Sequence, residues 1–220
     1  MNVKAFALAG AGCLALAGAA SADLVGAKVV NLGDIGAGVN SFQIYLIFDN
    51  AMDQLLAVNG DADVSPLVFE ATTPLVQNNL FEGMQAFDDV PTVADLGGDS
   101  WVVVGGVDTH NTGFSPNFLG GDGMESVIKG SHFEPLDNGG YFDQDPGSAE
   151  TPDEDMQIMI AQFTLALGEG QTATYVGTAN YNIGGGDLTA GAFSVTMGVP
   201  SPGALALLGL AGLAGGRRRR

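Results

Sequence analysis

The acidic segment at residues 137–155 carries the side chains that bind hard cations. Asp143, Asp145 and Glu154 stand at positions 1, 3 and 12 of a loop with the length of an EF-hand. Carboxylate oxygens are the ligands that calcium takes, and a bound ion would relieve the repulsion among them. An EF-hand is excluded, because Ser148 occupies position 6, where that loop requires glycine. Two interpretations stay open: a looser calcium site, or an acidic loop that is only solvated.

Other residues that could bind a metal or act in catalysis lack the partners that this chemistry needs. Asp108 and His110 could offer two metal ligands from one loop, but His132 lies too far along the chain to complete a zinc spacing. Ser126 and Lys129 have the Ser-x-x-Lys spacing of penicillin-recognising enzymes without the Ser-Asp-Asn and Lys-Thr-Gly motifs that accompany it. The many carboxylates leave an acid pair for glycoside hydrolysis open but select none. We therefore predict no catalytic residue and no cofactor, with calcium as an open alternative.

Carbohydrate binding is the non-enzymatic activity that fits the side chains best, because aromatic rings combine apolar faces with polar edges. The candidate residues are Trp101, Tyr141, Tyr175 and Tyr181. Trp101 alternates with Val103 in an apolar run, which favours a core position for its ring. Tyr141 follows two glycines, which predicts an exposed ring.

These residues have to be positioned by short strands. In residues 42–49 the apolar side chains Phe42, Ile44, Leu46 and Phe48 alternate with a second set, which is the period of a strand with one buried face. About nine short strands separated by Gly, Asn and Asp turns predict an all-β fold, an antiparallel β-sandwich. The expected strands cover residues 24–30, 42–49, 55–58, 66–69, 101–104, 126–128, 158–167, 172–181 and 192–197. Residues 137–155 are expected to form a long loop without strands.

The charge of the chain excludes one class of partner. Its 220 residues include 25 Asp and Glu against 7 Lys and Arg, and the net charge is −18. Between the two ends only Lys28 and Lys129 oppose the carboxylates. Binding to nucleic-acid phosphates needs clustered basic residues, so we predict no nucleic-acid partner. Cations, neutral glycans and basic proteins fit this charge.

The N-terminus has the features of an export signal. Lys4 precedes an apolar run at residues 5–19, and Ala20 and Ala22 supply the small side chains that a signal peptidase accepts. An uncleaved anchor helix is the alternative, but the run is short for a bilayer, which needs about 20 apolar residues. We predict cleavage after Ala22. Because Cys13 leaves with the signal, the mature chain would contain no cysteine and no disulfide.

The C-terminus carries a second apolar segment that adjoins basic residues. Val199, Pro200, Ser201 and Pro202 precede a Leu, Ala and Gly run at residues 203–216, and the chain then ends in Arg217, Arg218, Arg219 and Arg220. Such a helix would reach about 21 Å, at 1.5 Å per residue, into the membrane. A C-terminal core helix is the alternative. The terminal arginines favour the membrane, because they would hold this end in the cytoplasm by the positive-inside rule.

This order of a Pro-x-Pro triplet, a short hydrophobic helix and a terminal Arg cluster resembles the PEP-CTERM sorting signal of Gram-negative bacteria. Ser201 stands where that family most often has Glu. The resemblance implies removal of the tail by an exosortase in bacteria that make exopolysaccharide. The body, with Asp99-Ser100-Trp101 and Ala161-Gln162-Phe163-Thr164, resembles an uncharacterised secreted domain found upstream of such tails.

We predict three regions: a signal peptide at 1–22, an acidic β-sandwich body at 23–198 and a sorting tail at 199–220. The body would be flanked by an N-terminal signal helix and a C-terminal hydrophobic helix. The expected protein is exported to the cell envelope or extracellular matrix, is anchored by its C-terminus until processing, and is not an enzyme. Its expected partners are signal peptidase, an exosortase-like enzyme and exopolysaccharide. A secreted glycan-binding module or a glycan-active hydrolase is the alternative.

Overall fold

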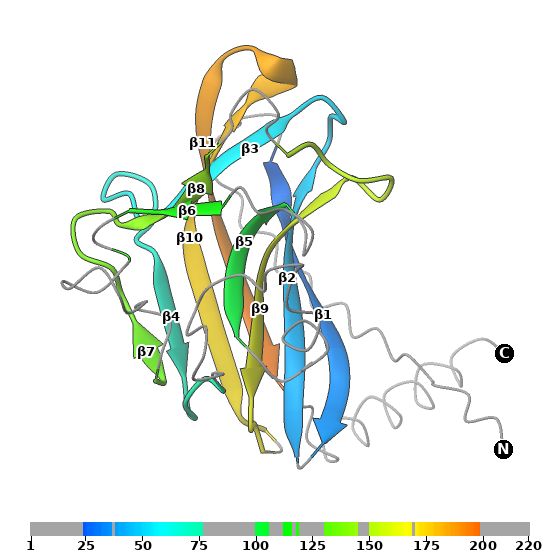
Figure 1. The fold of residues 1–220 in the computed structure, drawn as a ribbon, viewed down its shortest axis with the longest axis vertical. Helices are drawn as coiled ribbons and strands as arrows, with labels where there is room; N and C mark the ends of the chain where they lie inside the picture. The colour runs from blue at the N-terminus through cyan, green and yellow to red at the C-terminus, as the bar shows by residue number, and fades with distance from the viewer. Residues whose placement is uncertain are drawn as a thin grey trace, which may run out of the picture.

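The computed structural model describes residues 24–36, 38–76, 100–105, 112–115, 118, 130–144, 150–168 and 170–198. These residues form eleven strands in two antiparallel sheets (Figure 1). The predicted all-β class is therefore confirmed, and the two sheets form a sandwich-like body. The two flanking helices and the strand expected at 126–128 lie outside the described residues.

The first sheet has four strands in the order β1-β2-β9-β5. They are β1 (Leu24–Gly36), β2 (Val39–Phe48), β9 (Gln157–Leu165) and β5 (Trp101–Gly105). The alternation in β2 acts as predicted: the four apolar side chains from Phe42 to Phe48 are all buried, and Gln43 and Tyr45 on the other face are half-buried. Burial of one complete face fixes the register of β2 between β1 and β9, because a one-residue slip would bring the polar face inward.

The second sheet has seven strands around the long strand β10. Its members are β10 (Thr172–Asn182), β11 (Leu188–Gly198), β3 (Gln54–Asn59), β4 (Val68–Ala71), β8 (Gly140–Asp143), β6 (Thr112–Phe114) and β7 (His132–Phe133). β11 pairs with the whole of β10, while β3 and β4 pair with its C-terminal and N-terminal parts. β8 and β6 extend the sheet beyond β3, and β7 extends it beyond β4.

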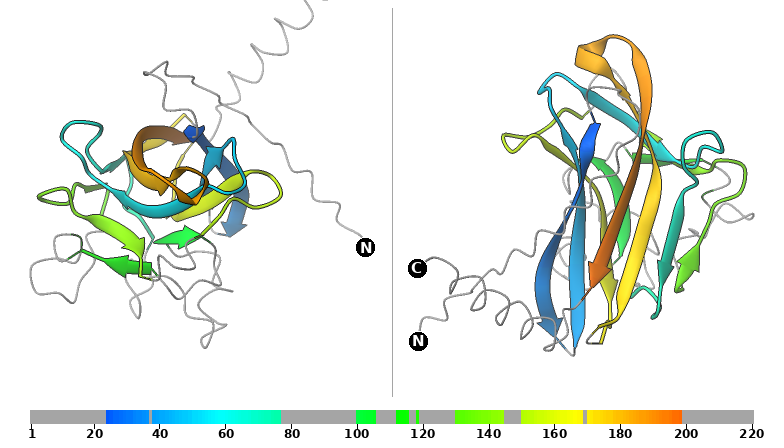
Figure 2. Two further views of the ribbon diagram at one scale, coloured as in Figure 1. Left: turned by 90° about the horizontal axis from the view of Figure 1, so that it is seen from above. Right: turned by 180° about the vertical axis from the view of Figure 1, so that it is seen from behind.

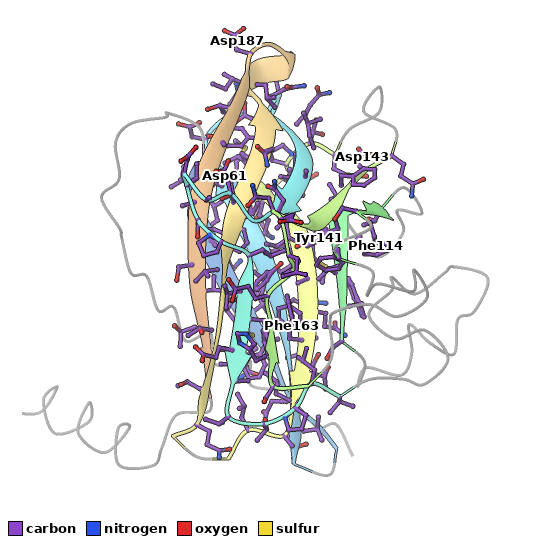
Figure 3. All side chains as sticks on the ribbon, turned by 90° about the vertical axis from the view of Figure 1, so that its left-hand side faces the viewer. Asp61, Phe114, Tyr141, Asp143, Phe163 and Asp187 are labelled. Atoms are coloured by element: carbon purple, nitrogen blue, oxygen red, sulfur yellow. The ribbon has the colours of Figure 1, made fainter. Side chains whose placement is uncertain are left out.

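Aromatic rings fill the core between the sheets. The ring of Phe163 in β9 lies 4.8 Å from that of Phe69 and 5.0 Å from that of Tyr175, measured between centroids, so it joins the two sheets (Figure 3). The Tyr141 hydroxyl donates to the backbone oxygen of Ile160 at 2.9 Å and lies 3.1 Å from the Tyr175 hydroxyl. A buried hydroxyl without such partners would cost about 1–3 kcal/mol.

Three short strands and one loop differ from the sequence-based expectation. β6, β7 and β8 were not predicted, since two to four residues are too few to display a strand period. The prediction of a strand-free loop at 137–155 is wrong, because β8 lies within it and Glu150 forms a β-bridge with Leu55. The physical reason is the edge of β3, whose backbone groups need hydrogen-bond partners and obtain them from this segment.

The edge strand β1 is interrupted at three points. Its register against β2 shifts between Leu24 and Gly26, between Asn31 and Gly33, and between Asp34 and Gly36. The extra residues at the first two shifts, Val25 and Leu32, are 64% and 48% exposed. β1 lies beside β11, the edge strand of the other sheet (Figure 2). Val25 and Leu32 are exposed because each is the extra residue of a bulge in β1.

Candidate functional site

The outer face of the four-stranded sheet carries an ordered row of polar side chains. Because the inner positions of β2 face the core, Gln43 and Tyr45 point to the opposite side of the sheet. Gln43 is directly opposite Gln162 of β9, and Tyr45 is directly opposite Lys28 of β1. We call Lys28, Gln43, Tyr45, Gln157 and Gln162 the polar face.

Hydrogen bonds connect these side chains across three strands. The Tyr45 hydroxyl donates to Gln43 Oε1 at 2.9 Å, and Gln43 Nε2 donates to Gln162 Oε1 at 3.3 Å. Lys28 Nζ donates to Gln157 Oε1 at 3.1 Å and lies 5.9 Å from the centroid of the Tyr45 ring, within the range of a cation–π contact. These bonds hold the amide and phenol groups in fixed orientations.

The side chains of the polar face can donate and accept hydrogen bonds to a ligand. Partial burial, together with the charge of Asp153, raises the pKa of Tyr45, so its hydroxyl stays protonated and can donate. Asp153 Oδ2 accepts from Gln157 Nε2 at 3.3 Å, which extends the network to the loop before β9. Amide groups both donate and accept, as sugar hydroxyls do. The five side chains contain no nucleophile paired with a general base, which covalent catalysis would need.

Trp101 of β5 lies at one end of this face, directly opposite Gln162 of β9. It is 5% exposed and forms a small apolar cluster with Val103 and Met159, against which Tyr45 packs. The prediction that Trp101 is a packed residue is confirmed. Its ring is therefore not open to a ligand.

The three candidate tyrosines Tyr141, Tyr175 and Tyr181 are fully buried in the core. The prediction of an exposed Tyr141 is wrong, because β8 pairs with β3 and turns this ring inward against Phe118 (Figure 3). Burial raises the pKa of both Tyr141 and Tyr175, so their hydroxyls stay protonated. These rings stabilise the fold and do not offer a stacking surface to a sugar.

The calcium candidates are only partly described. Asp143 lies on β8 and is buried, Glu154 lies in an exposed turn, and Asp145 is outside the described residues. Burial and the charge of Asp143 raise the pKa of Glu150, whose side chain lies against Gly105. No three acidic or imidazole groups gather closely enough for a metal ion in the part of the chain that the structure describes.

Several other predicted residues lie outside the described ranges, including Asp108, His110, Ser126, Lys129, Ala20, Ala22, Val199, Pro200, Ser201, Pro202 and the arginines at 217–220. His132 is described and exposed on β7, where it is directly opposite Glu70 of β4. The structure thus brings His132 beside a carboxylate and places no second histidine next to it among the described residues.

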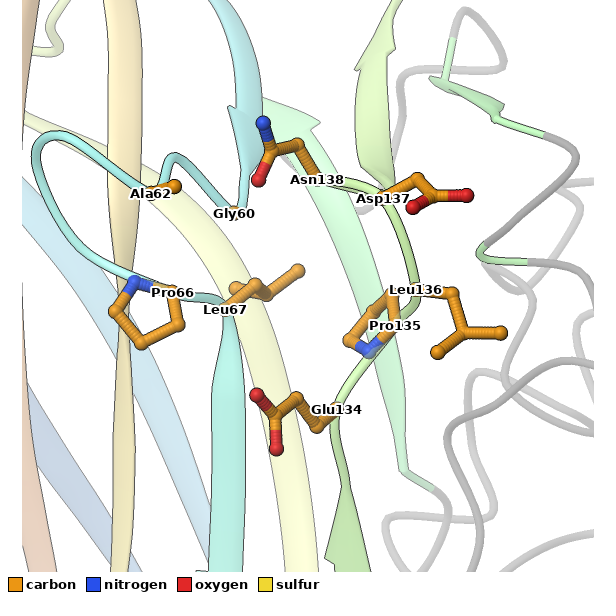
Figure 4. Close-up of a pocket in the computed structure, with 9 residues that line it drawn as sticks. All are labelled: Gly60, Ala62, Pro66, Leu67, Glu134, Pro135, Leu136, Asp137 and Asn138. Carbon is orange, nitrogen blue, oxygen red and sulfur yellow. The ribbon is translucent and has the colours of Figure 1, made fainter.

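A shallow pocket opens between the loop after β3 and the loop after β7 (Figure 4). It has a volume of about 440 Å³ and is lined by Gly60, Ala62, Pro66, Leu67, Glu134, Pro135, Leu136, Asp137 and Asn138. Gly60 N–H donates to the Gly139 oxygen at 3.3 Å and so joins the two loops. The lining combines proline and leucine carbons with the carboxyl groups of Glu134 and Asp137 and the amide of Asn138.

No family model, curated protein or solved structure matches this chain. Among the residues with a described structure, no helix has the length and apolar character needed to cross a bilayer.

Proposed function

We propose that the chain is an exported, non-catalytic protein of the cell envelope or exopolysaccharide matrix that is processed near Pro200 and Pro202. One observation carries this proposal: the described strands begin just after the predicted signal peptide and end just before the predicted sorting tail. β1 begins at Leu24, two residues after Ala22, and β11 ends at Gly198, one residue before Val199. Removal of both segments would leave every described strand intact.

The partners follow from the two segments. Signal peptidase would act on the N-terminal segment, and an exosortase-like membrane enzyme would act on the Pro-x-Pro tail. Until the second cleavage, the hydrophobic helix at 203–216 would hold the body on the outer side of the membrane, with the arginines in the cytoplasm. The body would then be released to the envelope or the matrix.

Replacement of the four arginines at 217–220 by glutamine is expected to stop this processing. Without these positive charges, nothing holds the C-terminal end of the hydrophobic helix in the cytoplasm. The exported protein should keep its tail, have a larger mass than the processed protein and change its cell fraction. Immunoblots of cell fractions and mass spectrometry of the C-terminus measure both effects.

A variant with four lysines at 217–220 is the matched control. It keeps the charge and the membrane orientation, so a processing defect in this variant would show that the enzyme recognises the guanidinium groups. Identical mass and location of the glutamine variant and the unmodified chain would refute the sorting proposal.

Glycan binding is a second candidate function, and the polar face favours it. The Gln43 amide and the Tyr45 hydroxyl are half-buried, are fixed by hydrogen bonds that reach the buried Gln162, and match the donors and acceptors of sugar hydroxyls. Between the two removed segments, 25 carboxylates are opposed only by Lys28 and Lys129, and this negative charge would repel an anionic polysaccharide, so the expected ligand is a neutral glycan. This function would give an exported matrix protein its attachment to the matrix.

The double variant Gln43→Ala with Tyr45→Ala is expected to weaken the binding of neutral oligosaccharides about tenfold. Each lost hydrogen bond costs about 0.5–1.5 kcal/mol, and about 1.4 kcal/mol corresponds to a factor of ten in affinity. A glycan array identifies the ligand, and titration calorimetry measures the change. Thr196→Ala, an exposed position on β11 in the other sheet, is the control and should bind normally.

Release of reducing sugar ends should be followed in the same samples. Turnover would favour the glycan hydrolase instead of the binding protein. Equal affinity of the double variant and the unmodified chain would exclude the polar face as the binding site.

A further inference from the structure

Asp53 is a buried carboxyl group without a counter-ion, one residue before β3. Its side chain is 0% exposed, and its Oδ2 has no hydrogen-bond partner. The described residues include one lysine, Lys28, and no arginine. Lys28 donates to Gln157 in the four-stranded sheet. An ionised Asp53 would therefore hold a buried charge that no described cation neutralises, which is costly in a folded protein.

The second oxygen of Asp53 connects two segments that are far apart in the sequence. Oδ1 accepts a hydrogen bond from the Gly184 N–H at 2.9 Å. Gly184 lies in the 3-10 turn η2 (Ile183–Gly185) between β10 and β11, with a φ of 54° that favours glycine. The last pair between β3 and β10 joins Gln54 to Asn182. The Asp53–Gly184 bond is thus the next link beyond that ladder, and it ties η2 to the start of β3.

The titratable groups on the segments next to Asp53 are acidic, and the one that acts on it directly is Asp49. Burial raises the pKa of Asp53, the Gly184 N–H partly offsets this, and the charge of Asp49 on the same loop raises it further. On the turn after β10 the titratable group is Asp187, at the tip of the molecule (Figure 3). On the segment that pairs with Leu55 it is Glu150, whose pKa is also raised by burial. All three of these groups are acids.

We propose that Asp53 is a proton-operated latch: the neutral acid holds η2 against the start of β3, and ionisation releases it. In the neutral form Oδ1 is a carbonyl oxygen that accepts from Gly184, and no buried charge remains. In the ionised form Oδ2 needs hydration, and the exposed turn at Ala51 and Met52 next to it has to open to admit water.

The direction of the pH dependence follows from linkage. The closed state binds the proton more tightly than the unfolded chain does, because its Asp53 pKa is the higher of the two. The contribution of the latch to stability is complete below the unfolded pKa and is lost as the pH rises through the folded pKa. This sign is opposite to that of a salt-bridged aspartate.

Nuclear magnetic resonance of the full chain between pH 4 and 8 tests the latch. We expect the Asp53 carboxyl resonance to titrate above the range of exposed aspartates and the Gly184 amide to follow the same midpoint. Protection of the Gly184 amide against hydrogen exchange, corrected for the intrinsic pH effect, should be lost as the pH passes that midpoint.

Variants separate the latch from general charge effects. Asp53→Asn keeps Oδ1 as an acceptor and cannot ionise, so Gly184 should stay protected at every pH. Asp49→Asn should shift the midpoint to lower pH by removing a repulsive charge, and Asp61→Asn, in the turn after β3, should behave like the unmodified chain.

Three results would overturn the proposal. The first is an ordinary Asp53 titration with constant Gly184 protection. The second is the same pH profile in Asp53→Asn, or, if that variant does not fold, an unshifted midpoint in Asp49→Asn. The third is a profile that disappears on addition of calcium, which would assign the unpaired oxygen to a cation.

Discussion

Gly140→Ala is expected to destabilise the protein by about 3 kcal/mol or more, the upper end of the cost of overpacking. A Cβ atom at this position would lie 2.2 Å from the Val58 oxygen and 2.5 Å from the Asn59 Cα. Both are backbone atoms of β3, which is held on its other side by β10. Relief of the collision would therefore require β8 to separate from β3. Urea unfolding followed by circular dichroism measures the loss.

Gly168→Ala is the matched control for this substitution. The nearest atom to its new methyl group would be the Gln171 Oε1 at 3.2 Å, at the end of a flexible side chain. Its unfolding midpoint should stay close to that of the unmodified protein. Similar midpoints for the two variants would contradict the close pairing of β8 with β3.

Phe163→Ala is expected to reduce the free energy of unfolding by about 3–5 kcal/mol, the usual cost of removing a buried phenylalanine ring. The ring is fully buried and contacts Phe69, Phe133 and Tyr175, so its removal leaves a cavity at the contact between the two sheets. Domains of this kind are stable by about 5–15 kcal/mol, and this one change would remove a large share of that.

Two further variants test the cause of that loss. Phe163→Leu fills part of the cavity and should recover much of the stability. Phe142→Ala removes the same ring from β8, where it is 38% exposed, and should have a much smaller effect. An equal loss in Phe142→Ala and Phe163→Ala would show that burial at the sheet contact is not the cause.

The fold was predictable where a strand is long enough to display its period. The alternation in β2 and the apolar positions Phe193, Val195 and Met197 in β11 are visible in the sequence, and all of these residues are buried. β6, β7 and β8 depend on pairing with strands that are distant in the sequence. For the same reason the two glycines before Tyr141 were a misleading signal. Gly140 permits a close backbone contact and does not mark an exposed loop.

The polar face was only half visible in the sequence. Alternation places Gln43 and Tyr45 together on one side of their strand, which is the signal that could have identified them. The partner Gln162 is 119 residues away from Gln43, and only the register of β2 against β9 brings the two amides together. Asp53 had no signal at all, because an acid next to a turn is normally exposed, and its burial depends on contact with η2.

The three bulges of β1 limit how copies of this protein can pair with one another through this edge. A straight edge strand offers a regular row of N–H and C=O groups on which another chain can add a strand, and this is how fibres and aggregates begin. In β1 that row is broken at Val25, Leu32 and Ile35, so a neighbouring strand cannot stay in register along its length. β1 therefore gives crowded copies of the protein no continuous edge on which to add a strand.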